Sequence, residues 1–400
     1  MLIFYFLGAI ALWLAIASLR SGLQFSKFVQ GELARPLPDF TPPVTVIAPC
    51  RGLDQGFSEN LEALFQQNYP SYEIIFVSDR ADDPALSALS KIRARHASPK
   101  SKIVIAGPAM ESGQKVHNLQ VATEEVASDS EVLVFVDTDT RPDQNWLRWL
   151  VQPLGTHQQI GASTGYRWFI PVRGNFASQL RSVWNASITS ALGSDDQRNF
   201  CWGGSTAIRR ETFEQLQARK RWRGTVSDDF ALTGMFREAG LPIHFVPQCL
   251  TPSLEDCTFT ELVEFTTRQL KITRVYAQHL WKPLLVGSAI FNIVFFGGLL
   301  LTSLRAMVGL SIAPAVALIA AVYLLGSMKA YIRFCAVRLV LKDYQTQLDK
   351  GLSFHVFLWP LASLLYLYNA VTAAFSRRIK WRGITYELKS PTEAVIISRE

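Results

Sequence analysis

The sequence predicts an α/β protein, with a Rossmann-like domain on a mostly parallel sheet and transmembrane helices at both ends of the chain. Short β-rich runs alternate with a helical pattern in the middle, and long uncharged runs lie near the ends. Of the 400 residues, 49% are hydrophobic and only 18% are charged, fewer than the usual quarter of a soluble domain. This composition argues against a disordered chain, and no nucleic acid is expected as a partner.

The first predicted element is an N-terminal transmembrane anchor over residues 1–20. Residues 1–19 carry no charged side chain and are long enough to cross a hydrocarbon core of about 30 Å. A cleaved signal peptide fits less well, because the run is long and no positive charge precedes it. Arg20 and Lys27 follow the run, which indicates that the next domain faces the cytoplasm.

Residues 42–283 form the predicted soluble domain. Its β-rich runs lie at residues 44–48, 73–77, 102–106 and 131–136. A helical pattern between the first two runs places Leu61, Leu64 and Phe65 on one face. Alternation of this kind predicts a parallel sheet with helices on both sides, and such sheets bind ligands beyond the carboxyl ends of their strands.

The remainder of the chain alternates between apolar and basic segments. We expect a transmembrane hairpin over 284–326, an amphipathic interfacial segment over 327–351, a third apolar segment over 352–376 and a basic tail over 377–400. Lys329, Arg333 and Arg338 recur at roughly helical spacing, which suits a helix on the membrane surface. His355 and Pro360 interrupt the third apolar segment, so it either spans the membrane or re-enters it.

The net charge of +7 is concentrated at the two ends of the chain. Residues 326–400 hold eleven Lys and Arg against five Asp and Glu, and residues 1–36 hold three against one. Basic ends around a near-neutral middle favour membrane flanks. A third crossing at 352–376 would place the basic tail on the far side, against the positive-inside tendency.

The five cysteines form no CxxC pair, so we expect reduced core thiols.

Acidic residues follow two of the predicted strands. Asp79 follows the run at 73–77, and Asp137 and Asp139 follow the run at 131–136. In an extended segment, residues i and i+2 project to the same side, so Asp137 and Asp139 can share one hard divalent cation together with phosphate oxygens. A D-x-D pair is common in solvated loops, but its place directly after an apolar strand favours the metal site.

A third acidic cluster, Asp228 and Asp229, precedes a predicted amphipathic helix. Asp229 is the candidate general base, and the competing interpretation is helix capping by Ser227 or an aspartate. Lys115 and Asn118 lie at the start of a predicted helix, directly after a loop. The N-terminus of a helix offers backbone N–H groups to an anionic ligand, and Lys115 adds a positive charge.

Together these motifs resemble the glycosyltransferase 2 superfamily, and most closely the ceramide glucosyltransferase family. The resemblance runs over nearly the whole chain. Its motifs are Pro49-Cys50-Arg51-Gly52-Leu53-Asp54, Asp79-x-x-Asp82-Asp83-Pro84, Lys115-x-x-Asn118-Leu119, Asp137 with Pro142-Asp143, Asp228-Asp229-Phe230 and Trp381-Arg382-Gly383-x-x-Tyr386.

The resemblance implies a cytoplasmic GT-A domain and an inverting, membrane-bound hexosyltransferase. Its donor would be a nucleotide sugar such as a UDP-hexose, and its acceptor a lipid taken from the bilayer. Asp79, Lys115, Asn118 and Asp137 would bind the donor. Asp137 and Asp139 would hold Mg²⁺ or Mn²⁺ on the diphosphate, and Asp229 would be the catalytic base.

The sequence departs from the family at its (Q/R)xxRW motif. The matching stretch, residues 268–272, reads RQLKI, with Lys271 in place of arginine and isoleucine in place of tryptophan. Lysine keeps a charge for phosphate but loses the bidentate fork of arginine. Arg268, Lys271, Trp381 and Arg382 therefore stand as the candidate acceptor and phosphate motif, and acceptor identity is the open question.

The sequence does not distinguish ceramide, diacylglycerol and hopanoid lipids as acceptors. It also does not identify the sugar or the nucleotide of the donor. Two other functions compete with lipid glycosylation. A polysaccharide synthase needs more membrane-spanning segments than the three apolar runs that follow the domain. A transporter or receptor with a cytoplasmic domain needs polar or broken helices at mid-membrane, whereas these spans read as plain anchors.

Overall fold

The computed structural model describes residues 1–156 and 158–399. The chain divides into two compact units. One, here the helical unit, contains Met1–Gln30, Ile170–Ser190 and Asp256–Ser376. The other, here the sheet unit, contains Gly31–Phe169, Ala191–Glu255 and Arg377–Glu400.

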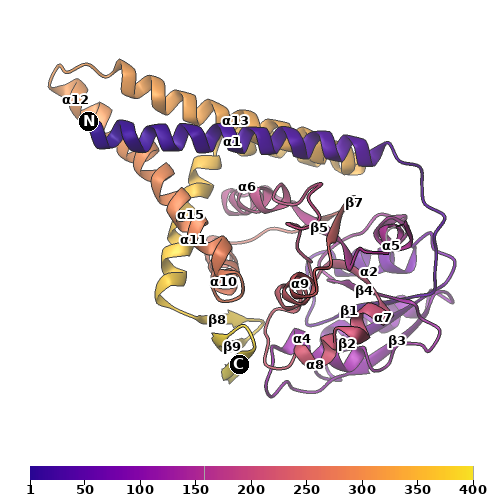
Figure 1. The fold of residues 1–400 in the computed structure, drawn as a ribbon. Coiled ribbons are helices and arrows are strands. Elements are labelled where there is room, and N and C mark those ends of the chain that lie inside the picture. The colour runs from indigo at the N-terminus through magenta and orange to yellow at the C-terminus, as the bar shows by residue number, and fades with distance from the viewer. Residues whose placement is uncertain (157, 400) are drawn as a thin grey trace. The chain divides into compact units, whose positions relative to one another are not determined.

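A seven-stranded mixed sheet forms the centre of the sheet unit (Figure 1). Its strands are β1 (Val44–Pro49), β2 (Tyr72–Ser78), β3 (Lys100–Ile105), β4 (Val132–Val136), β5 (Ala162–Ile170), β6 (Ser205–Arg209) and β7 (Ile243–Leu254), in the order β3-β2-β1-β4-β6-β5-β7. The first four pair in parallel, whereas β6 is antiparallel to both β4 and β5. The four predicted strands and the α/β class are confirmed.

Helices cover both faces of this sheet because its strand residues alternate between two apolar clusters. Val134 and Val136 pack with α2 (Phe57–Phe65), α3 (Pro84–Arg93) and α5 (Trp146–Thr156). Leu133 and Phe135 pack on the opposite face. The helices of that face are α4 (Gln114–Ala122), α7 (Arg210–Gln215), α8 (Ala218–Arg221) and α9 (Asp228–Glu238). Burial on both faces explains why β4 is a continuous apolar run.

The predicted basic tail folds as a second, antiparallel sheet. Its strands are β8 (Arg378–Trp381), β9 (Ile384–Ser390) and β10 (Glu393–Arg399). Arg382 and Gly383 form the turn between β8 and β9 with positive φ angles of 50° and 76°, as a tight two-residue hairpin requires. In β9, Ile384, Tyr386 and Leu388 alternate inward and are buried, so these residues are structured rather than a tail.

The helical unit contains three helices that are long and apolar enough to cross a membrane: Leu2–Leu33, Gln278–Met307 and Ala313–Val340. The second consists of α11 (Gln278–Asn292), a π-helical turn (Ile293–Gly297) and α12 (Gly298–Met307). The other two are α1 and α13. The unit also holds α6 (Phe176–Thr189), α10 (Phe259–Tyr276), α14 (Gln345–Phe357) and α15 (Trp359–Phe375).

Two segments take a course that differs from the predicted boundaries. The boundary at residue 326 falls inside α13, which continues to Val340, so Lys329 and Arg333 belong to this helix. Lys329 Nζ donates to Ser18 Oγ of α1 at 2.8 Å, and Arg333 is buried. The third apolar segment belongs to a helix pair, Lys342–Phe357 and Trp359–Phe375, bent by 71°.

Candidate active site

The acidic residues of the sheet unit gather at the carboxyl ends of its parallel strands. β4 ends at Val136, so Asp137 and Asp139 lie just beyond it, and Asp79 lies just beyond Ser78 of β2. Because β2, β1 and β4 are parallel neighbours, their carboxyl ends share one edge of the sheet. This edge is where ligands bind in open α/β sheets.

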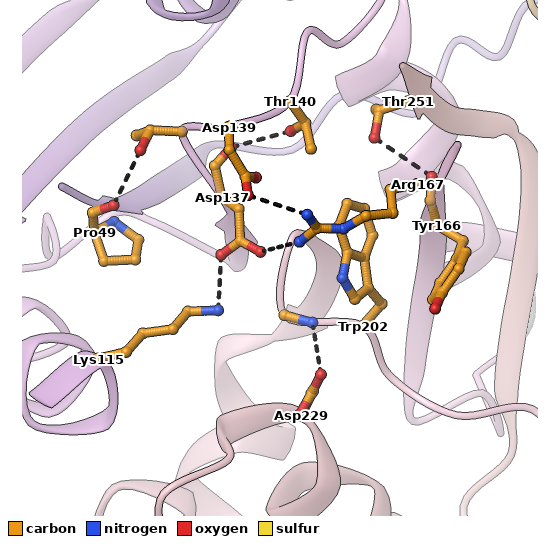
Figure 2. A network of polar contacts seen from close by, with 12 residues as sticks. Pro49, Lys115, Asp137, Asp139, Thr140, Tyr166, Arg167, Trp202, Asp229 and Thr251 are labelled. Atoms are coloured by element: carbon orange, nitrogen blue, oxygen red, sulfur yellow. Dashed lines mark hydrogen bonds and ion pairs between the residues drawn. The ribbon is translucent and has the colours of Figure 1, made fainter. Parts of the chain in front are cut away.

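The side chains of Asp137 and Asp139 point to the same side and meet one guanidinium (Figure 2). Arg167 of β5 donates from Nη2 to Asp137 Oδ2 at 3.1 Å and from Nη1 to Asp139 Oδ2 at 3.0 Å. On the other side of Asp137, its Oδ1 lies 2.7 Å from Lys115 Nζ, at the start of α4. Two cations from separate elements therefore flank the two carboxylates.

Charge pairing outweighs burial at this network. Burial alone raises the pKa of Asp137, but Lys115 and Arg167 lower it below its ordinary value. Burial lowers the pKa of Lys115, and the carboxylates of Asp137, Asp228 and Asp229 more than reverse that effect. Both residues of the Lys115–Asp137 pair are therefore charged at neutral pH.

The two aspartates fit a divalent cation that is shared with a diphosphate. Asp139 Oδ1 is buried without a hydrogen-bond partner, although a carboxylate oxygen in such a position needs a cation or a donor. Within residues 1–156 and 158–399, no group of three or more His, Cys, Asp or Glu side chains forms a complete metal cage. A site with two carboxylates leaves the remaining positions to phosphate and water, the arrangement usual for Mg²⁺.

Asp228 and Asp229 begin α9 and have different surroundings. Asp229 is half-buried, and its carboxylate accepts from the backbone N–H of Phe230 at 2.8 Å and from the hydroxyl of Ser227. Its other oxygen accepts from Gly203 N–H at 3.4 Å (Figure 2). The Ser227 side chain makes no capping bond to the helix backbone.

Asp228 is buried, 2% exposed, and its Oδ1 lies 3.4 Å from Lys115 Nζ. Burial raises the pKa of Asp228 to about 6, although Lys115 opposes the shift. Its second oxygen has no hydrogen-bond partner. Asp228 thus gives Lys115 a second carboxylate partner, whereas Asp229 is the more accessible carboxylate.

Two glycines let the backbone approach this cluster. A Cβ on Gly203 would lie 2.3 Å from Asp228 Oδ2 and 2.8 Å from Lys115 Nζ. A Cβ on Gly204 would lie 2.2 Å from the Trp202 ring. Trp202 in turn packs its ring under the Arg167 guanidinium, 4.9 Å from ring centre to Cζ, so both glycines are needed for the packing around Arg167 and Lys115.

Asn118 lies on α4 but is buried, and its side chain accepts a hydrogen bond from Gln114 at 2.9 Å. Gln114 also bonds the backbone at Gly107 and Ala109. Asn118 therefore supports the loop before α4, and among the described residues no hydrogen bond joins it to the carboxylates of the cluster. Asp79 pairs with Arg51 at 3.2 Å, and its Oδ1 is buried without a hydrogen-bond partner.

The second sheet brings Arg382 to the edge of the first. Arg382 Nη2 lies 2.7 Å from Asp54 Oδ1, in the loop after β1. Burial lowers the pKa of Arg382, but Asp54 and Asp139 raise it overall, which places this guanidinium within electrostatic reach of the D-x-D pair. The backbone N–H of Gln114 donates to Tyr386 Oη at 3.1 Å, so β9 also braces the start of α4.

Of the other predicted residues, Trp381 ends β8, and Arg268 and Lys271 lie on α10 of the helical unit. Arg268 stacks over the Phe265 ring at 5.5 Å, and Lys271 Nζ donates to Ser376 Oγ at 3.4 Å. Burial lowers the pKa of Lys271. These contacts connect α10 to its own unit.

Sequence reasoning missed Arg167, and it assigned no role to Arg51 or Asp54. Arg167 is the one charge in the otherwise uncharged run ASTGYRWFI, and a lone charge inside a buried strand is the signal that could have identified it. Asp54 offered no comparable signal, because its partner Arg382 is 328 residues away in the chain.

Comparison with known proteins agrees with this fold. Over 92% of this chain and 98% of the other, the structure is similar to a mannosyltransferase from Pyrobaculum calidifontis solved with GDP-Man and Mn²⁺, with a TM-score of 0.50 and 18% identity. That likeness concerns the fold, and it confirms the GT-A class. The architecture is that of a GT-A fold in a chain that also has candidate membrane helices.

The sequence matches glycosyl transferase family 21 over residues 5–394, and the chain belongs to that family. It is also similar to two Caenorhabditis elegans proteins. Ceramide glucosyltransferase 1 is 33% identical over 86 residues, and ceramide glucosyltransferase 3 is 27% identical over 81 residues. The aligned segments cover 21% and 20% of this chain, and 18% of the length of each relative.

Proposed function

We propose that this protein is a membrane-bound inverting glycosyltransferase. It moves a hexose, with glucose as the first candidate, from a UDP-sugar to a hydroxyl of a membrane lipid such as ceramide. The proposal rests on family membership, on the three candidate membrane helices and, above all, on one observation. At one sheet edge the D-x-D carboxylates lie beside a buried lysine, with an accessible carboxylate, Asp229, at the start of α9.

The donor diphosphate binds beside Lys115 and the D-x-D pair. Asp137 and Asp139 would hold Mg²⁺ or Mn²⁺, and such an ion would supply positive charge to the leaving diphosphate. Lys115 stays protonated next to Asp137 and Asp228, so it offers a fixed positive charge to the same phosphates. Asp79 and Arg51 lie beyond the ends of β2 and β1, where they bind the nucleotide base.

Asp229 takes the proton from the acceptor hydroxyl as that oxygen attacks the anomeric carbon. Hydrogen bonds from Phe230 N–H and Gly203 N–H orient this carboxylate. The sugar–phosphate bond breaks on the opposite face, so the configuration at the anomeric carbon inverts. Holding the three reacting centres in line supplies much of the rate enhancement.

The proposed topology places both sheets on the cytoplasmic side. β9 bonds the start of α4 inside the sheet unit, so residues 31–169 and 377–399 lie on one side of the membrane. If α1, α11–α12 and α13 each cross, the chain returns to that side before α14. The pair α14 and α15, bent by 71°, must then re-enter instead of crossing.

An impermeant maleimide tests this topology on intact cells. The Ser311→Cys variant, in the loop between α12 and α13, should be labelled from outside, and Thr392→Cys, between β9 and β10, should be labelled only after permeabilisation. External labelling of Thr392→Cys would show that the α14–α15 pair crosses.

A product assay tests the activity. Purified protein is incubated with a panel of labelled nucleotide sugars and a total lipid extract, and the products are identified by mass spectrometry. A glycolipid that forms with one sugar donor supports the proposal. Sugar polymer without glycolipid supports a polysaccharide synthase instead, and the absence of any transfer contradicts both.

A further inference from the structure

Arg167 occupies the face of the D-x-D pair that a metal ion needs (Figure 2). One oxygen of each aspartate is bound to its guanidinium, at 3.1 Å and 3.0 Å. The other two oxygens have different surroundings: Asp137 Oδ1 pairs with Lys115, whereas Asp139 Oδ1 has no hydrogen-bond partner. A cation that bridges both carboxylates therefore competes directly with the guanidinium.

The position of Arg167 is built into the fold. Its side chain is only 12% exposed, and its guanidinium lies 4.9 Å from the Trp202 ring centre and 5.4 Å from that of Phe169. The Trp202 ring packs directly against Gly204, where a Cβ would lie 2.2 Å from the ring. Aromatic packing of this kind orients the fork of the arginine toward both aspartates.

We propose that Arg167 is an internal counter-ion that fills the metal position until the donor arrives. Without nucleotide, it keeps divalent cations out. The diphosphate brings extra ligands for the metal and an alternative partner for the guanidinium, so metal and nucleotide bind together. This inference rests on the proposed donor site and names a residue that couples its two ligands.

The magnitude follows from charge repulsion. A unit positive charge about 5 Å from a divalent ion, in a medium as polar as water, weakens binding of that ion by about tenfold, and by more in a partly buried site. Removal of Arg167 should therefore tighten metal binding in the absence of nucleotide by at least about tenfold, with a smaller gain in the presence of UDP.

Electron paramagnetic resonance of free and bound Mn²⁺ tests this without turnover. Wild-type protein, Arg167→Gln and Arg167→Lys are titrated with Mn²⁺, with and without UDP, and thermal unfolding verifies that each is folded. Arg95→Gln is the control, since Arg95 pairs with Glu62 of α2 in an exposed contact. We expect tight Mn²⁺ binding by Arg167→Gln without UDP, intermediate binding by Arg167→Lys, and wild-type behaviour in the control.

Equal Mn²⁺ affinity of wild type and Arg167→Gln without UDP, or weaker binding by the variant, overturns the inference. Absence of Mn²⁺ binding in all proteins, even with UDP, overturns it as well. Failure of the proposed lipid glycosylation has a different signature, because Mn²⁺ and UDP can bind cooperatively to a protein that makes no glycolipid.

A second inference comes from the helical unit, where two cations lie one turn apart on α13. Arg333 is 4% exposed, and its Nε is buried without a hydrogen-bond partner. Lys329 donates to Ser18 Oγ at 2.8 Å. Within the described residues, neither cation forms an ion pair with a carboxylate, and the groups that interact electrostatically with Arg333 are Lys329, His355 and Tyr366.

Buried cations in a membrane helix are costly unless an anion accompanies them. Basic pockets between membrane helices on the cytoplasmic side bind the phosphate groups of lipids. We infer that Arg333 and Lys329 bind the phosphate of an anionic membrane lipid. A lipid is favoured over free phosphate because both residues belong to a candidate membrane span.

Native mass spectrometry tests this site with phosphatidylglycerol and phosphatidylcholine added to the detergent-purified protein. Arg305→Gln is the matched control, because Arg305 lies in the last turn of α12 and donates to Ser311 O near 3 Å in the loop that precedes α13. We expect Arg333→Gln to lose at least about fivefold in phosphatidylglycerol retention relative to Arg305→Gln. Equal retention in the two variants overturns the site, and displacement of the lipid by millimolar inorganic phosphate identifies free phosphate instead.

Discussion

Lys115 Nζ lies 2.7 Å from Asp137 Oδ1 and 3.4 Å from Asp228 Oδ1, so one ammonium joins the ends of α4, β4 and α9. All three groups are largely buried, and the lysine retains its proton because two carboxylates surround it. The contact joins three elements that are distant in the chain. The candidate donor site therefore depends on the packing of all three.

The first prediction concerns Asp229 as the base. Asp229→Asn removes proton abstraction but keeps the shape and most hydrogen bonds, so transfer should fall by about 10²–10⁴-fold while UDP affinity changes little. Rates come from glycolipid formation, and affinities from calorimetry. Asp195→Asn, on an exposed loop, is the control. Normal turnover by Asp229→Asn would refute the assignment.

The second prediction concerns pH and Asp228. Its pKa is raised to about 6 in the folded protein, from an ordinary value near 4. The folded state therefore binds the proton more tightly than the unfolded state, so this residue makes the free energy of unfolding decrease as pH rises from about 4 to about 6. Asp228→Asn should lose that part of the slope in thermal unfolding scans. If the free energies of unfolding of wild type and Asp228→Asn differ by the same amount across this pH range, the raised pKa is contradicted.

The third prediction concerns the close approach at Gly203. Gly203→Ala forces the new methyl group against Asp228 Oδ2 and Lys115 Nζ, so UDP affinity should drop by about tenfold or more. Gly234→Ala is the matched control, because Gly234 lies in α9 and a methyl group added there would meet no atom within 4 Å. Alanine at that position should stabilise the helix by about 1 kcal/mol. Equal UDP affinity in the two variants would contradict the importance of this close approach.

The fourth prediction concerns the bond between the two sheets of the sheet unit. Tyr386→Phe leaves the buried N–H of Gln114 without its acceptor, so the free energy of unfolding should fall by about 1–3 kcal/mol. UDP affinity should fall too, since Gln114 precedes Lys115. Tyr368→Phe, at an exposed position on α15, should change neither quantity. If both variants unfold like wild type, the second sheet does not brace α4.

The sequence predicted the parallel half of the sheet well, for a physical reason. Strands β1 to β4 are short apolar runs, each bounded by turn or helix residues, so local pattern is sufficient to find them. β9 alternates in the same way, but its context of basic residues made it read as a tail. The role of its inward side chains depends on a long-range contact, the hydrogen bond between Tyr386 and Gln114, which are 272 residues apart in the chain.

The candidate site shows the same division. Asp79, Asp137 and Asp139 follow recognisable strands, so the sheet edge could be predicted from local pattern. Arg167 could not be placed there, because its contact with Asp137 depends on β6 lying between β4 and β5 in the sheet. Strand order of that kind is decided by packing of the whole domain, which no local pattern encodes.

Lipid glycosylation with Asp229 as the base is tested by mass spectrometry of lipids after incubation with UDP-hexose, for the wild-type protein and for Asp229→Asn. We predict a hexosylated lipid with inverted anomeric configuration from the wild type, and at most a trace from Asp229→Asn. A lipid fraction that stays unmodified with every nucleotide sugar, or a product that retains the donor configuration, would contradict the proposed reaction.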